Sequence, residues 1–287
     1  MKTVSYSIRG MWSVECGMRL LRPLILPLLV FSFLFPLSSF LSPLRAQSDD
    51  FGLDFSLEAQ KKLSKQWSLG LEGELRTRNN TKTVDRWALG LGVDYKVAKW
   101  LKASAGYTLL YDHNQRTTYF DATDDAVLDG DADAGDPKKC ADYWGTRHRF
   151  NLSLTADKKL FGDFKFSLRE RWQYTWRPEH TVSERWSYLD NAYDGKEKTY
   201  SGKGKSVLRS RLQVEYDKKG LAITPYVNVE FFNAWRLEKV RYHAGFDWKV
   251  AKQHTLGIFY RYQHVNADED ELENNIHLIG VGYKFKF

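Results

Sequence analysis

The chain has 287 residues, of which 43% are hydrophobic, 28% charged and 15% aromatic, and its formal net charge is +7. This length supplies enough residues for one large domain or two small ones. The charged fraction excludes a bundle of transmembrane helices, which needs several uncharged runs of about 20 apolar residues. The hydrophobic and aromatic content excludes a disordered chain.

The first element in chain order is an apolar run over residues 20–44, which begins directly after Arg19. A basic start, an apolar middle and a small residue before a polar stretch describe a secretory signal peptide. The alternative is a membrane-anchoring helix, which the prolines of this run disfavour. The sequence therefore predicts a leader over residues 1–46 that is cleaved after Ala46, with Met18 as an alternative start of the chain.

Removal of this leader changes the cysteine count and the charge of the chain. Of the two cysteines only Cys140 remains, so no intramolecular disulfide can form. The leader holds five of the 43 basic residues and one of the 36 acidic residues, so the mature chain has 38 against 35. A net charge this small gives no reason to expect nucleic acid as a partner.

The mature chain, residues 47–287, has apolar residues at alternate positions, the pattern of strands with one apolar and one polar face. Eleven segments show this pattern and none shows convincing helical periodicity. They run for about the 9–11 residues that a tilted strand needs to cross a bilayer. In chain order the segments are 51–59, 67–75, 87–95, 101–111, 150–154, 164–174, 208–216, 223–231, 242–248, 256–262 and 279–287.

A soluble sandwich also alternates, but four features favour a membrane barrel. The face opposite the apolar one is densely charged, connections alternate between tight and long, and the chain stops on an apolar strand ending in Phe287. The fourth feature is a set of aromatic residues at segment ends on the apolar face, as an interfacial girdle requires. These are Trp67, Trp87, Tyr111, Trp172, Tyr174, Tyr216, Trp248 and Tyr262.

The connections indicate how the barrel is oriented. Tight, lysine-containing turns lie at residues 62–65, 96–99 and 249–252, and the long connections are roughly 112–144, 176–204 and 265–275. In outer-membrane barrels short turns face the periplasm and long loops face outside. The sequence therefore predicts an all-β fold, a transmembrane antiparallel up-and-down β-barrel of about 10–12 strands. Since single-chain bacterial barrels have even strand numbers, eleven segments leave two options: a missed strand inside 176–204, or an incomplete first crossing.

Several stretches carry a resemblance to a known family. The turns with two lysines and the C-terminal aromatic strand, residues 282–287, are similar to Gram-negative outer-membrane β-barrels generally. More narrowly, residues 63–69, 73–78, 167–174 and 207–212 resemble a family of such barrels known only as a domain of unknown function. The resemblance implies the bacterial outer membrane as location and brings no catalytic residues with it.

The same resemblance implies the partners of the chain. Outer-membrane lipid and lipopolysaccharide are expected around the barrel. The barrel-assembly machinery is expected to recognise a C-terminal signal made of Tyr283, Phe285 and Phe287.

If the apolar face contacts lipid, the charged face lines the lumen, and two interpretations stay open. In a barrel of this size side chains fill most of the interior, so the charges would form a salt-bridged plug. Alternatively, the slight arginine excess lines a narrow, anion-guiding pore. The lumen set is Glu58, Glu72, Glu74, Arg76, Asp94, Arg147, Arg149, Arg169, Arg171, Arg209, Arg211, Glu215, Glu230, Arg241, Asp247 and Arg261.

Neither a metal nor a cofactor is predicted. The acidic loop at 121–136 fails the EF-hand test, because a loop starting at Asp129 has Ala134 at position six and Cys140 at position twelve. The acidic run 268–271 is predicted to be another solvated loop. No His or Cys pair has the spacing of zinc ligands.

The rival function is a surface hydrolase acting on lipid or peptide with histidines and aspartates of the outer rim. Nucleophilic catalysis needs a nucleophile, a base and an orienting group that meet in space. No serine lies in a recognisable motif of such enzymes, so the sequence favours a non-enzymatic barrel. The rim histidines are His113, His148, His180, His264 and His277.

Overall fold

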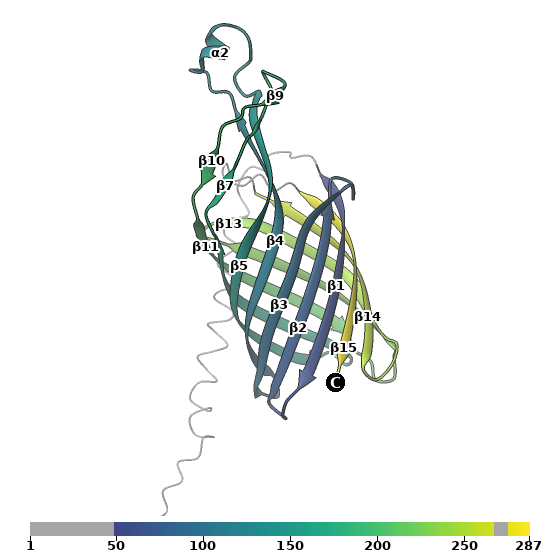
Figure 1. Cartoon of the computed structure of the whole chain (residues 1–287). Coiled ribbons are helices and arrows are strands. Elements are labelled where there is room, and N and C mark those ends of the chain that lie inside the picture. The colour runs from purple at the N-terminus through teal and green to yellow at the C-terminus, as the bar shows by residue number, and fades with distance from the viewer. Residues whose placement is uncertain (1–48, 267–274) are drawn as a thin grey trace, which may run out of the picture. The chain divides into compact units, whose positions relative to one another are not determined.

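The computed structural model describes residues 49–266 and 275–287, which form a closed β-barrel (Figure 1). Each of the eleven segments predicted from the alternating pattern falls on a different barrel strand, and the last segment extends one residue past its strand, to Phe287. The all-β barrel and the count of eleven are confirmed. The strands are β1 (Asp50–Lys62), β2 (Trp67–Arg78), β3 (Thr83–Ala98), β4 (Leu101–Tyr119), β5 (Pro137–Leu160), β6 (Phe164–Arg177), β11 (Lys203–Tyr216), β12 (Ile223–Asn233), β13 (Leu237–Lys249), β14 (His254–Val265) and β15 (Ile276–Lys286).

The barrel closes through a parallel pair between its first and last strands. β1 and β15 run in the same direction, from the pair Asp50–Ile276 to the pair Gln60–Lys286, whereas the other neighbouring barrel strands are antiparallel. The prediction of a fully antiparallel barrel is therefore wrong at this pair. An odd number of alternating strands brings the first and the last into the same direction, and their pairing leaves no open edge.

The expectation of an even strand number is also wrong. Between β6 and β11, where a missed strand was one option, the chain forms short strands only. For the other option, an incomplete first crossing, β1 pairs with both of its neighbours over most of its length. The short strands are β7 (His180–Val182), β8 (Trp186–Ser187), β9 (Ala192–Tyr193) and β10 (Lys198–Tyr200).

β4 and β5 are the longest strands, with 19 and 24 residues, and they continue past the barrel wall as a two-stranded ribbon (Figure 1). The short helix α2 (Asp125–Leu128) lies at the tip of this ribbon. β8 pairs with β5, and β7 pairs with β10 beside it. We call residues 113–146 and 178–202 the loop extension. It stands at the end of the barrel with the long connections, opposite the short lysine turns.

The barrel wall inverts the usual distribution of polar and apolar side chains. On the outer face Leu57 is 64% exposed and Leu89 is 55% exposed. On the inner face Asp54 and Glu230 are each 3% exposed. Successive residues of a strand face opposite sides of the sheet. The alternating pattern therefore places the apolar side chains on the outer face and the charged side chains on the inner face around the barrel.

Leu212 lies in the middle of the apolar outer face, opposite Leu168 of β6 and Val229 of β12. Replacing Leu212 by arginine should destabilise the barrel in lipid vesicles by about 2–4 kcal/mol, because the charge enters hydrocarbon near the midplane. Urea unfolding measures this loss. Leu63→Arg, in the exposed turn after β1, is the matched control and should change stability little; equal losses in both variants would contradict the lipid-facing position of Leu212.

The predicted leader, residues 1–46, and the acidic run 268–271 lie outside the described residues, so cleavage after Ala46 stays a prediction. In the described part of the chain no helix has the length and apolar character that a membrane-spanning helix needs.

Candidate functional site in the charged barrel interior

The sixteen charged residues predicted to line the lumen all lie on the inner parity of their strands. The strand register shows this, because each of these residues is paired with inner-face residues of the neighbouring strands. Arg76, for example, is opposite Arg86 of β3 and Asp54 of β1. Glu230 and Arg76 are buried, whereas Glu72 and Asp247 are open to solvent. Both exposed carboxylates lie in the strand halves nearer the short turns, so water enters the lumen from that end.

Two further carboxylates hold this interior together and were absent from the predicted set. Asp54 accepts from Arg76 Nη2 at 3.2 Å and from Arg261 Nη1 at 2.8 Å. Asp112 pairs with Arg86 and with Arg147, whose Nε lies 3.1 Å from its Oδ2. The alternating pattern alone could have placed Asp54 in the lumen, because Asp54 lies on the polar face of the first predicted segment. Asp112 was assigned to a loop because the extension of β4 beyond residue 111 has no apolar alternation.

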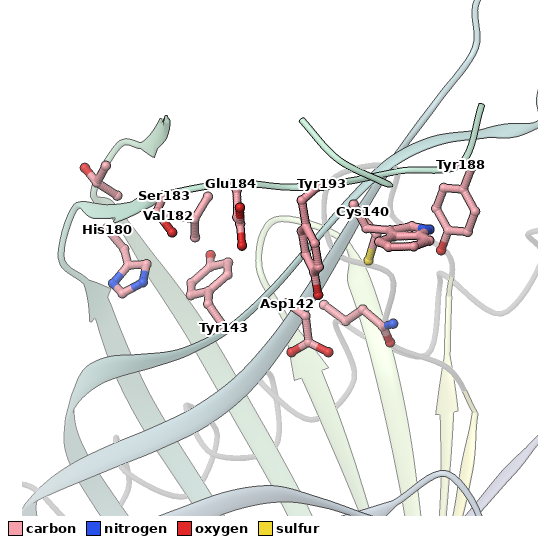
Figure 2. Close-up of a pocket in the computed structure, with 12 residues that line it drawn as sticks. Cys140, Asp142, Tyr143, His180, Val182, Ser183, Glu184, Tyr188 and Tyr193 are labelled. Atoms are coloured by element: carbon pink, nitrogen blue, oxygen red, sulfur yellow. The ribbon is translucent and has the colours of Figure 1, made fainter. Parts of the chain in front are cut away.

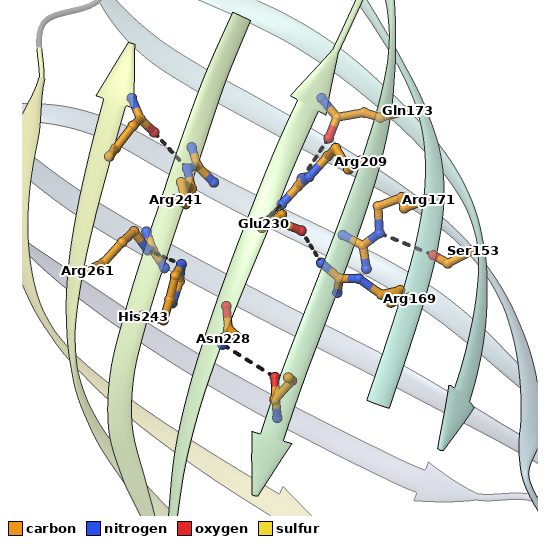
Figure 3. Close-up of polar contacts among 12 residues, drawn as sticks. Ser153, Arg169, Arg171, Gln173, Arg209, Asn228, Glu230, Arg241, His243 and Arg261 are labelled. Atoms are coloured by element: carbon orange, nitrogen blue, oxygen red, sulfur yellow. Dashed lines mark hydrogen bonds and ion pairs between the residues drawn. The ribbon is translucent and has the colours of Figure 1, made fainter. Parts of the chain in front are cut away.

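Glu230 is the carboxylate at the centre of the arginine-rich wall. It projects from β12 and pairs with Arg169 and with Arg209 Nη2, the latter at 2.8 Å. Arg209 also donates from Nη1 to Gln173 Oε1 at 2.8 Å. Figure 3 shows these side chains pointing into the lumen from neighbouring strands. The three charges neutralise one another in part, and Glu230 is almost fully enclosed by them.

Four other carboxylates of the predicted set form ion pairs. Glu74 accepts from Arg76 Nη2 at 2.8 Å. The remaining pairs join a carboxylate to lysine: Glu58 with Lys284 at 2.7 Å, Asp94 with Lys102 at 3.2 Å and Glu215 with Lys165 at 3.2 Å.

Six predicted residues form no ion pair within 4 Å among the described side chains. Arg241 instead donates from Nε to Gln263 Oε1 at 2.7 Å and lies 4.6 Å from the ring of Phe232. Arg171 donates from Nε to Ser153 Oγ at 3.1 Å. The interior is therefore only partly neutralised, and its excess charge is positive. The six residues are Glu72, Arg149, Arg171, Arg211, Arg241 and Asp247.

A second site candidate is a pocket of about 580 Å³ in the loop extension. Tyr143, Trp186 and Tyr193 line it with Asp142 and Glu184 (Figure 2). The ring of Tyr143 stacks on His180 at 4.5 Å between centroids, and the hydroxyl of Tyr143 is buried without a hydrogen-bond partner among the described residues.

The rim histidines are dispersed rather than gathered at one centre. His113 bonds Asp142, which lines this pocket. His148 contacts the Tyr107 hydroxyl at 2.8 Å, and His277 contacts Asp49 at 3.1 Å. Within residues 49–266 and 275–287, no serine, threonine or cysteine side chain is hydrogen-bonded to any of them.

The acidic loop uses its carboxylates internally. Asp124 bonds Lys138 Nζ at 2.5 Å and accepts the N–H of Asp121 at 2.8 Å. These two contacts hold the pKa of Asp124 below its ordinary value. In the part of the chain that the structure describes, no group of three or more His, Cys, Asp or Glu side chains could hold a metal ion.

The C-terminal residues continue the sheet at the short-turn end. Phe287 donates its backbone N–H to the Gln60 carbonyl at 3.0 Å and accepts from the N–H of Lys62 at 3.0 Å. Its ring stacks on Phe285 at 5.2 Å, and Tyr283 faces outward. The three aromatic residues of the predicted signal thus lie along the outer face of the last strand.

An apolar outer wall, a charged interior and a closed sheet define an outer-membrane-like β-barrel. The chain belongs to the family described as a protein of unknown function (DUF2490), whose model matches residues 51–274. The resemblance inferred from the sequence is thereby confirmed. None of the curated proteins matches this chain.

Solved structures similar to this chain include the following three. The β domain of the autotransporter BrkA from Bordetella is 16% identical, with 79% of this chain and 86% of that chain covered and a TM-score of 0.49. The translocator domain of the autotransporter NalP from Neisseria meningitidis is 11% identical, with 71% of each chain covered and a TM-score of 0.40. The outer-membrane protease OmpT from Escherichia coli is 8% identical, with 76% and 80% covered and a TM-score of 0.35.

Proposed function

We propose that this protein is a non-enzymatic barrel of the bacterial outer membrane, whose lumen is filled by its own charged side chains and passes ions poorly. Support for the location comes from the wall itself: leucines and aromatic residues such as Leu57, Leu89 and Trp87 are exposed around the barrel. A surface of this kind is stable against lipid acyl chains and unstable in water. Lipid and lipopolysaccharide are the partners that it fits.

The observation that carries the closed lumen is the set of buried ion pairs that line its inner wall. Asp54, Asp112 and Glu230 are each about 3% exposed, and each is shared by two arginines from different strands. Charges buried at low dielectric constant attract strongly and are held in fixed geometry. Side chains held in this way along the wall narrow the space left for a water-filled channel, which supports the closed lumen.

Planar-bilayer recordings with refolded mature protein test this proposal. The native barrel should show little conductance in chloride, and any small current should favour anions because of the arginine excess. Asp112→Asn should raise the current, because it releases Arg86 and Arg147 from their shared carboxylate. Large, steady, porin-like conductance of the native protein would defeat the closed lumen.

Assembly into the membrane gives a further prediction. Deleting Phe287 should lower the folded, heat-modifiable fraction on unboiled gels of cell envelopes, because the chain then lacks the terminal aromatic residue and its two backbone bonds to β1. Phe161→Ala, at an exposed turn between β5 and β6, is the control and should fold normally. Normal folding of the deletion variant in cells would count against recognition of Phe287 by the assembly machinery.

Hydrolysis in the pocket of the loop extension is a second candidate, favoured by one observation. Asp142 lines the pocket and bonds Nε2 of His113, which orients the imidazole. Nδ1 of His113 lies 3.4 Å from Arg78 Nη2, so activation of water by this nitrogen would require Arg78 to move away. Purified protein in detergent, assayed against a panel of ester and peptide substrates, tests it. Activity that His113→Gln abolishes while the barrel stays folded would support hydrolysis, and a native protein inactive on the whole panel would reject it.

A further inference from the structure

Four arginines face each other across one strand pair in the lumen. Arg171 of β6 is directly opposite Arg209 of β11, and Arg169 of β6 is directly opposite Arg211 of β11. Like charges in directly opposite positions repel each other and destabilise a sheet. A guanidinium cannot relieve this repulsion by losing its proton. We call these four residues the arginine block.

Among the described residues, a single carboxylate, that of Glu230, forms ion pairs with the arginine block. Glu230 pairs with Arg169 and Arg209, while Arg171 and Arg211 have no carboxylate within 4 Å among the described residues. Four cations and one anion leave an excess of three positive charges at one place in the wall.

The arginine block also retains hydrogen-bond donors, and two of its four side chains are partly open to solvent. The Nε atoms of Arg169 and Arg209, which belong to the two arginines paired with Glu230, are buried without a hydrogen-bond partner among the described residues. Arg171 and Arg211 are partly accessible to solvent, whereas Glu230 is sealed beneath the block. The exposed Glu72 shows that water reaches the lumen beside β2. A small anion that enters with this water would meet planar donor groups in a fixed arrangement.

From these contacts we infer that the arginine block is a binding site for a doubly charged oxyanion of the phosphate type, held by Arg171 and Arg211. Guanidinium forks match the oxygens of phosphate, and two negative charges offset most of the excess of three. Chloride supplies one charge and no fixed geometry. The ligand is inorganic phosphate or the phosphate group of a small metabolite. This inference rests on the proposed barrel with a charged interior and names what that interior binds.

Isothermal titration of detergent-solubilised mature protein with sodium phosphate, at constant ionic strength set by sodium chloride, tests the site. We expect saturable binding of one phosphate per chain. Arg171→Gln and Arg211→Gln should each weaken it at least about tenfold, because each removes a charged hydrogen-bonding partner. Lys102→Gln removes a lumen cation that is paired with Asp94 elsewhere, so it should change the affinity less than about twofold.

Two further variants and a second ligand extend this test. Glu230→Gln raises the excess charge, so it should tighten phosphate binding if the variant folds. The Arg171→Lys variant keeps the charge but loses the fork, and it should weaken binding by an intermediate factor. Titration with methyl phosphate distinguishes inorganic phosphate from the phosphate group of a small metabolite. If methyl phosphate binds as tightly as inorganic phosphate, the site accepts a phosphate monoester. If it binds much more weakly, the ligand is the free ion.

Absence of saturable phosphate binding at constant ionic strength overturns the site, as does equal weakening by Lys102→Gln. These results leave the closed lumen untouched, because that proposal is decided by conductance in chloride. Conversely, phosphate binding by a barrel that conducts like a porin would keep the site and reject the closed lumen.

Discussion

Replacing Glu230 by glutamine should destabilise the barrel by about 3–5 kcal/mol, one of the largest effects expected of a single lumen residue. The wild-type carboxylate is 3% exposed and neutralises two guanidiniums, those of Arg169 and Arg209. Glutamine keeps the size and one acceptor oxygen but removes the charge. Four like charges then face one another across β6 and β11 without the carboxylate that neutralised two of them.

Equilibrium unfolding of the mature chain in urea, followed by the fluorescence of its nine tryptophans, measures this loss. Glu72→Gln is the matched control, since Glu72 lies in the same lumen, is open to solvent and forms no ion pair within 4 Å among the described residues. Its effect should stay within about 0.5 kcal/mol. Similar losses in the two variants would show that total lumen charge, rather than the pairing at Glu230, sets stability.

The barrel and its inner face could be predicted from sequence because both follow from one local signal. Alternation of apolar and polar residues marks each strand and also assigns each side chain to the lipid or to the lumen. Placing Arg169 and Arg171 inside, for example, needs no knowledge of which strands pair. Parity is a property of the chain, so eleven strands could be found one at a time.

The contacts of the interior could not be predicted in the same way. Asp54 and Arg261 are 207 residues apart, and they meet only because the sheet closes. Glu72 carries the same charge and parity as Glu230, yet Glu72 stays open to solvent and Glu230 is buried among arginines. Which carboxylate meets which guanidinium depends on strand tilt and register around the whole barrel. No local pattern carries that information.

The parallel pairing of the first and last strands could have been predicted from the number of segments. Eleven alternating segments already imply that the first and last strands run in the same direction. Because single-chain bacterial barrels have even strand numbers, a twelfth strand in the long connection 176–204 is one of the two options that the sequence leaves open. That connection instead forms the short strands β7 to β10 of the loop extension.

Asp54 is the residue that ties this parallel closure together. It projects from β1 and binds Arg76 of β2 at 3.2 Å and Arg261 of β14 at 2.8 Å. The Arg261 contact passes over β15, where Gly280 is opposite Asp54 and has no side chain in the way. The ring of Phe259 covers that glycine, and Arg261 lies 5.0 Å from the centre of the ring. One carboxylate thus joins strands on both sides of the seam.

Asp54→Asn should therefore cost about 3–5 kcal/mol, because two buried guanidiniums lose their shared charge at once. The control is Glu58→Gln on the same strand. Glu58 crosses the same seam to Lys284, but both side chains are more than one-third exposed, and such pairs contribute about 0–1 kcal/mol. Hydrogen exchange of the β1 and β15 amides in detergent should rise in Asp54→Asn well above the rise in β4 and β5. A uniform rise in all strands would mean that Asp54 stabilises the barrel as a whole, and would reject a specific role in holding its first and last strands together.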